Sequence, residues 1–189
     1  MAPSRRPHVL GIDDGPFSKG QREPVPIVGV MMEGADLVEA IAVTEFPVDG
    51  ADATNFLAQW IEGLRLRPTL QGVVLGGITI AGLGVVDLSA LAAAVGAPVL
   101  AVTRRSTANH RVRDALEAAG LLERIETVER AQPSFEAEPG LYVSHAGAAR
   151  DTAEQLVRAT RKKSKLPEPL RIAHLIAAAI ARGESRGRV

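Results

Sequence analysis

The chain contains no cysteine and few aromatic residues, and each scarcity excludes a class of function. Without cysteine, its 189 residues form no disulfide, no thiolate metal site and no cysteine nucleophile. Aromatic residues make up 3%, too few for a binding face of stacked rings. No stretch of the sequence approaches the roughly 18 consecutive apolar residues that a membrane span needs. The N-terminal arginines are not followed by the long apolar run of a secretory signal. We therefore expect a cytoplasmic protein with no membrane partner.

Apolar residues are plentiful, and charge is unevenly distributed. The hydrophobic fraction of 46% is enough for a core, and the length favours a single domain over residues 1–189. Net charge is zero, yet residues 1–149 hold 12 basic and 18 acidic side chains, whereas residues 150–189 hold 10 and 4. The basic C-terminal helical segment, residues 148–189, fits a contact with phosphate and fits a solvated helix end equally well.

The order of the expected elements is typical of a mixed α/β sheet. Strands are expected at residues 8–13, 27–32 and 37–46, and the links between them are too short for a helix, which makes them antiparallel. Helices and strands then alternate: helices at 56–64, 87–95, 109–119, 148–161 and after 166–169, and strands at 71–75, 98–103 and 141–144. The later crossovers predict parallel strands beside the antiparallel three, with helices on both faces.

Two adjacent carboxylates, Asp13 and Asp14, end the first expected strand. The ends of such strands are where mixed α/β sheets bind ligands. Adjacent strand residues point to opposite faces, so one of the two is expected to face a given site, where it suits a cation such as Mg²⁺. Asp-Asp-Gly-Pro is also strong turn chemistry, and spacing alone favours the turn.

The glycine-rich stretch at residues 76–84 suggests a nucleotide loop but lacks the residues that such a loop needs. A phosphate-binding loop ends in Gly-Lys-Ser or Gly-Lys-Thr, which is absent, and Asp87 occupies the third glycine position of a dinucleotide pattern. Close backbone packing at a strand end explains the glycines better. Asp52 and Asp87 each precede a helix and are interpreted as N-caps.

The terminal helix carries an apolar stripe and a polar side. The stripe consists of Ile172, Leu175, Ile176, Ala179 and Ile180. At about 100° per residue, His174 lies nearly opposite the stripe, which argues against a core histidine. Arg171 shares its side of the helix, so the two are either an ordinary exposed pair or the wall of a site. Arg104 and Arg105, directly after the strand at 98–103, can meet phosphate.

Three segments resemble the endonuclease dU family, long catalogued as a domain of unknown function (number ninety-nine). They are GIDDGPF at Gly11–Phe17, LGGITIAGLGVVDLSAL at Leu75–Leu91 and PEPLRIAHLIAAAIARGESRGR at Pro167–Arg188, and the resemblance covers nearly the whole chain. The family looks like a relative of endonuclease V, which has a ribonuclease H-like fold. The resemblance therefore implies a ribonuclease H-like mixed sheet, in agreement with the expected element order.

The resemblance also implies an activity and a site. Endonuclease V uses carboxylates and Mg²⁺ or Mn²⁺ to cut a phosphodiester near a deaminated base, and uracil in DNA is the base that the family name suggests. The first metal-binding aspartate falls at Asp13, with Asp14 beside it. The Leu-Pro-Glu-Pro…Arg…Ala-His motif matches this chain and brings Arg171 and His174 into the site. The family's lysine falls near Arg104, which keeps the charge but changes the geometry.

Two carboxylates that the resemblance implies are missing. Gly76 stands where relatives commonly read Leu-Asp-Gly-Ile-Thr, and Asn55 stands where a helix glutamate is expected. The acids left to substitute are Asp14, Asp52, Glu62 and Asp87. Metal-assisted cleavage needs carboxylates that offset the charge of the ion. The sequence thus predicts a metal-dependent endonuclease with reduced activity or, as the alternative, a non-catalytic nucleic-acid-binding protein on a nuclease scaffold. It leaves the oligomeric state open.

Overall fold

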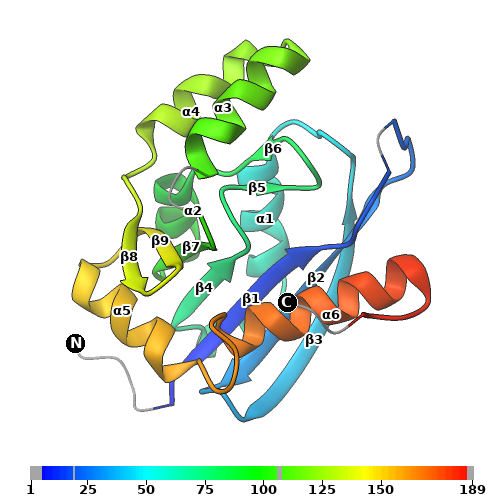
Figure 1. Ribbon diagram of the computed structural model, residues 1–189. Coiled ribbons are helices and arrows are strands. Elements are labelled where there is room, and N and C mark those ends of the chain that lie inside the picture. Colours follow the sequence, from blue (N-terminus) through cyan, green and yellow to red (C-terminus); the bar gives the residue numbers. More distant parts are fainter. Residues whose placement is uncertain (1–5, 19, 106–107, 187–189) are drawn as a thin grey trace.

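The computed structural model describes residues 6–18, 20–105 and 108–186 (Figure 1). Within these ranges, a seven-stranded sheet has the order β3-β2-β1-β4-β7-β9-β8, and β5 and β6 pair separately. The strands of the large sheet are β1 His8–Asp14, β2 Val25–Glu33, β3 Leu37–Phe46, β4 Gly72–Leu75, β7 Val99–Thr103, β8 Phe135–Glu138 and β9 Leu141–Ala146. The small pair is β5 Thr79–Ile80 and β6 Gly84–Val85.

Helices flank the large sheet on both faces (Figure 1). The α-helices are α1 Ala53–Glu62, α2 Leu88–Val95, α3 Ala108–Ala119, α4 Ile125–Arg130, α5 Arg150–Ala159 and α6 Glu168–Arg182, with 3₁₀ turns at Arg67–Thr69 and Leu122–Arg124. None of the helices in the described ranges combines the length and the apolar character that crossing a membrane requires.

The pairing of the first strands confirms the predicted mixed sheet. Strands β1, β2 and β3 are consecutive antiparallel neighbours. On its other side β1 pairs in parallel with β4, with Ile12 opposite Leu75, and β4 pairs in parallel with β7. Asp13 follows Ile12, and Gly76 follows Leu75. This register therefore places Asp13 and Gly76 side by side, where β1 and β4 end.

Strand β9 differs from the prediction. The alternation of helices and strands predicts a parallel strand, but β9 runs antiparallel to β7. The reason is that β8, which was not predicted, forms a hairpin with β9 that turns at Gly140, whose φ is 75°. The short helix α4 and the β5–β6 pair were not predicted either.

Strand alternation gives each face of the sheet its own core. Leu10 and Ile12 of β1 belong to the core that includes α1 and α2. Val9 belongs to the opposite core, which includes residues of α5 and the start of α6. Since Gly11 and Asp13 follow Val9 at intervals of two, they point to the same face as α6.

Helix α6 packs on the sheet through small residues together with only part of the predicted apolar stripe. Ala173 and Ala177 are buried against β2, whereas Ile180 is 50% exposed. A Cβ atom at Gly11 would lie 2.2 Å from the backbone nitrogen of Leu170. Ile172 and Ile176 of the predicted stripe are partly buried beside the two alanines, so the prediction is right for these two residues and wrong for the exposed Ile180.

The two expected N-caps behave differently. Asp87 caps α2 by accepting hydrogen bonds from the backbone N–H groups of Ser89 and Ala90, at 2.9 and 3.0 Å. Asp52 occupies the N-cap position of α1 with a φ of 60° and makes no capping bond. Its carboxylate accepts hydrogen bonds from the Asn55 side-chain amide instead.

Removing the cap of α2 is expected to destabilise the protein. An Asp87→Ala variant leaves two backbone N–H groups without their acceptor and should lose about 1 kcal/mol of unfolding free energy in urea titrations. Asp87→Asn keeps an acceptor oxygen and should stay close to the wild type. Equal losses in the two variants would show that the cap is not the cause.

Candidate functional site

The two carboxylates at the end of β1 point to different neighbours, as strand alternation predicts. Asp13 Oδ2 lies 2.7 Å from His174 Nδ1, which joins residues 161 positions apart in the sequence. Asp14 Oδ2 accepts a hydrogen bond from the backbone N–H of Ala81, at 3.1 Å. The glycine-rich segment thus holds Asp14, and α6 brings an imidazole to Asp13.

These contacts shift the pKa values of both neighbours of Asp13. The hydrogen bond to Asp13 raises the pKa of His174 above its ordinary 6.5, against the opposing effect of partial burial. Burial, followed by the like charge of Asp13, raises the pKa of Asp14 to about 7. Near neutral pH, Asp14 is therefore partly protonated, and the contact with Asp13 favours the charged form of His174.

An Asp13→Asn variant tests the pairing directly. We expect the pKa of His174 to fall toward or below 6.5, because the variant removes the charged acceptor that stabilises the imidazolium. The Asp13–His174 contact stabilises the fold fully at a pH below the pKa that His174 has in the unfolded chain. This stabilisation is lost as the pH rises through the higher pKa that His174 has in the folded protein. Histidine ring NMR titrations measure the shift, with Asp14→Asn as a control of smaller effect. An unchanged pKa in Asp13→Asn would contradict the assignment.

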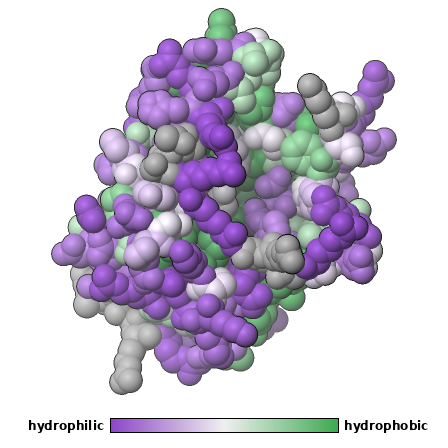
Figure 2. Space-filling model, in the orientation of Figure 1, coloured by the Kyte–Doolittle hydropathy of each residue, from purple (hydrophilic) through white to green (hydrophobic). Residues whose placement is uncertain are grey.

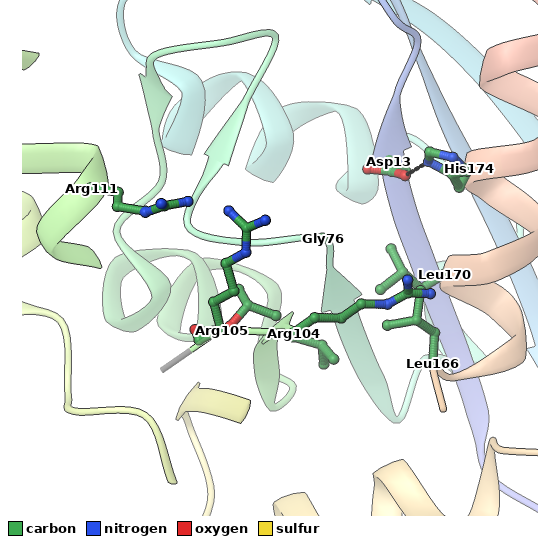
Figure 3. A pocket seen from close by; sticks show the side chains of 10 residues that line it. Asp13, Gly76, Arg104, Arg105, Arg111, Leu166, Leu170 and His174 are labelled. Carbon is green, nitrogen blue, oxygen red and sulfur yellow. Dashed lines mark hydrogen bonds and ion pairs between the residues drawn. The ribbon is translucent and has the colours of Figure 1, made fainter. Parts of the chain in front are cut away.

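The Asp13–His174 pair borders an open pocket of about 590 Å³. Arg105 and Arg111 extend into the space across from the pair, while Arg104 extends below Gly76 toward Leu170 (Figure 3). In the space-filling view the surface is hollowed between the α3–α4 helices and α6, and hydrophilic side chains gather along the hollow (Figure 2). The pocket therefore combines a carboxylate, an imidazole and three guanidinium groups.

The three arginines of this pocket have no carboxylate partner among the described residues. Several arginines elsewhere are paired, for example Arg150 and Arg158 with Glu154, and Arg161 with Glu138. An unpaired guanidinium group presents all its donors to an incoming ligand, and its planar fork matches the oxygens of a phosphate. Arg104, Arg105 and Arg111 therefore equip the pocket to bind a phosphorylated ligand.

Arg171 does not line this pocket. Its guanidinium is hydrogen-bonded to the buried carboxylate of Glu168, with a shortest distance of 2.6 Å. The pair holds the first turn of α6, just before His174. A phosphate contact by Arg171 stays a prediction, and it would require the guanidinium to leave Glu168.

Gly76 lies directly beside Asp13. A Cβ atom at this position would lie 2.8 Å from Asp13 Oδ1, so a carboxylate here would reach the same space. The acids proposed as substitutes have other partners: Asp87 caps α2, Glu62 pairs with Arg67, Asp52 binds Asn55, and Asp14 binds the backbone of Ala81.

The residues present do not fit the Mg²⁺ or Mn²⁺ site that the resemblance implies. In the described part of the chain, no group of three or more acidic or histidine side chains is placed to hold a metal ion. Asp13 Oδ2 is engaged by His174, and Asp14 Oδ2 accepts a hydrogen bond from the backbone N–H of Ala81. The arrangement can bind an anion and hold a proton on His174.

Sequence reasoning did not find Arg111. This residue comes from α3, and only the position of that helix beyond the sheet brings its side chain to the pocket. Nothing in the sequence distinguishes Arg111 from any other arginine on the polar face of a helix.

Known proteins match the chain over most of its length. The family model for endonuclease dU matches residues 5–181. A UPF0215 protein of Methanothermobacter thermautotrophicus is 36% identical over 193 residues, covering 95% of this chain and 90% of the relative. The crystal structure of a protein of unknown function from Archaeoglobus fulgidus has a TM-score of 0.83 at 31% identity and covers 93% of this chain and 98% of that one.

The fold is also shared with a nuclease. Endonuclease V of Ciona intestinalis, solved in complex with a 24mer DNA containing an inosine followed by a ribo-adenosine, has a TM-score of 0.57. At 17% identity it covers 92% of this chain and 84% of its own. This likeness shows that the chain has the ribonuclease H-like fold of endonuclease V.

Proposed function

The chain belongs to the endonuclease dU family, and on that premise we propose that it binds a nucleic-acid strand, DNA foremost, at the Asp13–His174 pocket. We further propose that metal-dependent cleavage on this nuclease-like scaffold is reduced or lost. The observation that carries the proposal is that three arginines without a carboxylate partner among the described residues line the same open pocket as Asp13 and His174.

The charges of the pocket favour a polyanion. Each arginine can form two parallel hydrogen bonds with phosphate oxygens, and a nucleic-acid backbone supplies phosphates at regular intervals. The endonuclease V of Ciona intestinalis, whose fold this chain shares, is solved with DNA. His174 adds a fourth donor, because its Nδ1 binds Asp13 and a protonated ring can also donate from Nε2.

The missing carboxylates are the reason to expect weak cleavage. Gly76 removes the oxygen donor that would lie beside Asp13, and Asn55 binds Asp52 instead of contributing to the pocket. Carboxylates offset the charge of a divalent ion, so their loss weakens its binding. No cleavage step is therefore assigned to a metal ion in this chain.

A metal-dependent endonuclease acting on uracil-containing DNA is the second candidate. It is favoured by the intact pair of Asp13 and His174, the two residues that the family resemblance places in the catalytic site. In this case another ligand, such as a phosphate oxygen of the substrate, would have to complete the metal site.

Binding to a labelled, uracil-containing single strand at increasing salt concentrations tests the main proposal. We expect salt-sensitive binding, with the slope of log K against log salt reduced by about 0.7 in Arg104→Gln and in Arg111→Gln. Arg65→Gln is the matched control, since this exposed arginine lines a pocket at β3 and has no carboxylate partner among the described residues. Binding that is absent, or equally salt-sensitive in all variants, would refute the proposal.

Cleavage of the same strand with Mn²⁺ separates the two candidates. No cleavage by the wild type, together with binding, supports a scaffold reduced to binding. Cleavage by the wild type that Asp13→Ala abolishes would establish the endonuclease.

A further inference from the structure

Asp13 and His174 form a wall between two pockets. The second pocket, of about 410 Å³, lies on the other side of the wall. It is lined further by Asp14, Gly15, Pro16, Phe17, Ala178 and Arg182. Since His174, Ala178 and Arg182 are spaced four residues apart, they follow one face of α6 and connect the wall to the far end of the helix.

Arg182 resembles the arginines of the first pocket. Arg182 makes no ion pair with a carboxylate of the residues that the structure describes. Arg171, on the same helix, does form an ion pair, with Glu168. Arg182 lies eight residues beyond His174, which is about 12 Å along the helix. Unpaired cations therefore stand on both sides of the wall, an arrangement that suits a ligand with several phosphates.

Phe17 gives the second pocket an aromatic surface. Its ring is half-buried and packs against the core beside the glycine-rich segment, where a Cβ atom at Gly82 would lie 3.2 Å from its Cζ atom. The ring is thus held in place while it lines the pocket. An aromatic platform next to a cation is the combination that binds single-stranded nucleic acids, because every base can stack.

Resting on the proposed function, we propose that the second pocket is a nucleotide subsite of the same strand. Arg182 binds a backbone phosphate, and the neighbouring base stacks on Phe17. The strand then crosses the Asp13–His174 wall on a path from Arg111 to Arg182. Because a base stacked on Phe17 cannot remain paired in a duplex, the ligand is an unpaired stretch of nucleic acid.

The ordinary explanation of these residues makes a different prediction. An arginine in the last turn of a helix is stabilised by the helix dipole, and Phe17 belongs to the edge of a core. If this were their whole role, changing either residue would leave the binding of nucleic acid unchanged.

Binding of a short oligothymidylate strand, measured by fluorescence anisotropy across a salt series, distinguishes the two. We expect Arg182→Gln to lower affinity and to reduce the salt slope by about 0.7, as Arg104→Gln does. Phe17→Leu should weaken binding about fivefold or more with no change of slope, because it removes stacking and no charge. Arg65→Gln should change neither, and thermal unfolding of each variant controls for loss of fold.

The outcomes separate this inference from the proposed function. One outcome is that Arg104→Gln and Arg111→Gln reduce the salt slope while Arg182→Gln, like Arg65→Gln, leaves it unchanged. In that case the strand does not cross the wall, so this inference fails while the proposed function stands. If none of the three reduces the slope, the proposed function fails as well. A reduced slope in Arg182→Gln with unchanged affinity in Phe17→Leu would overturn the stacking of the base.

Discussion

A Gly11→Ala variant is expected to lose about 3 kcal/mol of unfolding free energy, at the upper end of the usual cost of overpacking. Its Cβ atom would lie 2.2 Å from the nitrogen of Leu170 and 2.2 Å from the carbonyl carbon of Pro169. Both are backbone atoms, so no side-chain rotation relieves the clash. The whole of α6 has to move away from β1.

Such a movement also reaches the site. Leu170 lies one turn before His174 on α6, and Gly11 lies two residues before Asp13 on β1. The 2.7 Å contact between Asp13 and His174 depends on the close approach of these two elements. We therefore expect Gly11→Ala to lower the pKa of His174 as well, even under conditions in which the variant remains folded.

Urea unfolding measures the loss, with Gly72→Ala as the matched control. Gly72 is also a buried glycine in a central strand, but the nearest atom to its Cβ would be Leu156 Cδ1 at 3.3 Å, the movable end of a side chain. Its variant should stay within about 1 kcal/mol of the wild type. Similar losses at both positions would mean that the contact with α6 is not special.

The sequence predicted those elements that residues close together in the chain determine, and it missed those that depend on contacts with distant segments. The bounds of β3 were predicted correctly at residues 37–46, and α2 ends at Gly96, whose φ of 59° suits glycine. In contrast, β8 alternates Phe135 and Ala137 with glutamates and becomes a strand through its pairing with β9. The orientation of α6 also depended on a tertiary contact, the close approach of its first turn, at Pro169 and Leu170, to Gly11 of β1.

The site shows the same division. Helical phase indicated correctly that His174 is not a core residue, although His174 borders the buried side of α6, one turn beyond Leu170. The family resemblance pointed to Asp13 and Arg104. The direct contact between Asp13 and His174, and the approach of Arg111 from α3, could not be inferred, because they follow from how distant elements pack. The hydrogen bond from the backbone of Ala81 to Asp14, which was expected as a metal ligand, could not be inferred either.

Introducing an aspartate at Gly76 is expected to strengthen the binding of a divalent cation beside Asp13. The new carboxylate would lie beside Asp13, close enough that Asp13 must turn aside, since a Cβ atom at position 76 is already 2.8 Å from Oδ1. Two carboxylates at this distance repel each other without a cation and bind one together. We expect Gly76→Asp to bind Mn²⁺ at least about tenfold more tightly than the wild type.

Thermal unfolding with and without Mn²⁺ reveals this gain without relying on cleavage. A ligand that binds only the folded state stabilises it, by about 2.7 kcal/mol when its concentration is 100 times its dissociation constant. Gly76→Asp should therefore be less stable than the wild type in a chelator and gain stability as Mn²⁺ is added. Gly76→Asn has the same size without the charge and should gain nothing. If the wild type gains as much as Gly76→Asp, then Asp13 already holds the ion with other ligands, and the case for lost cleavage falls.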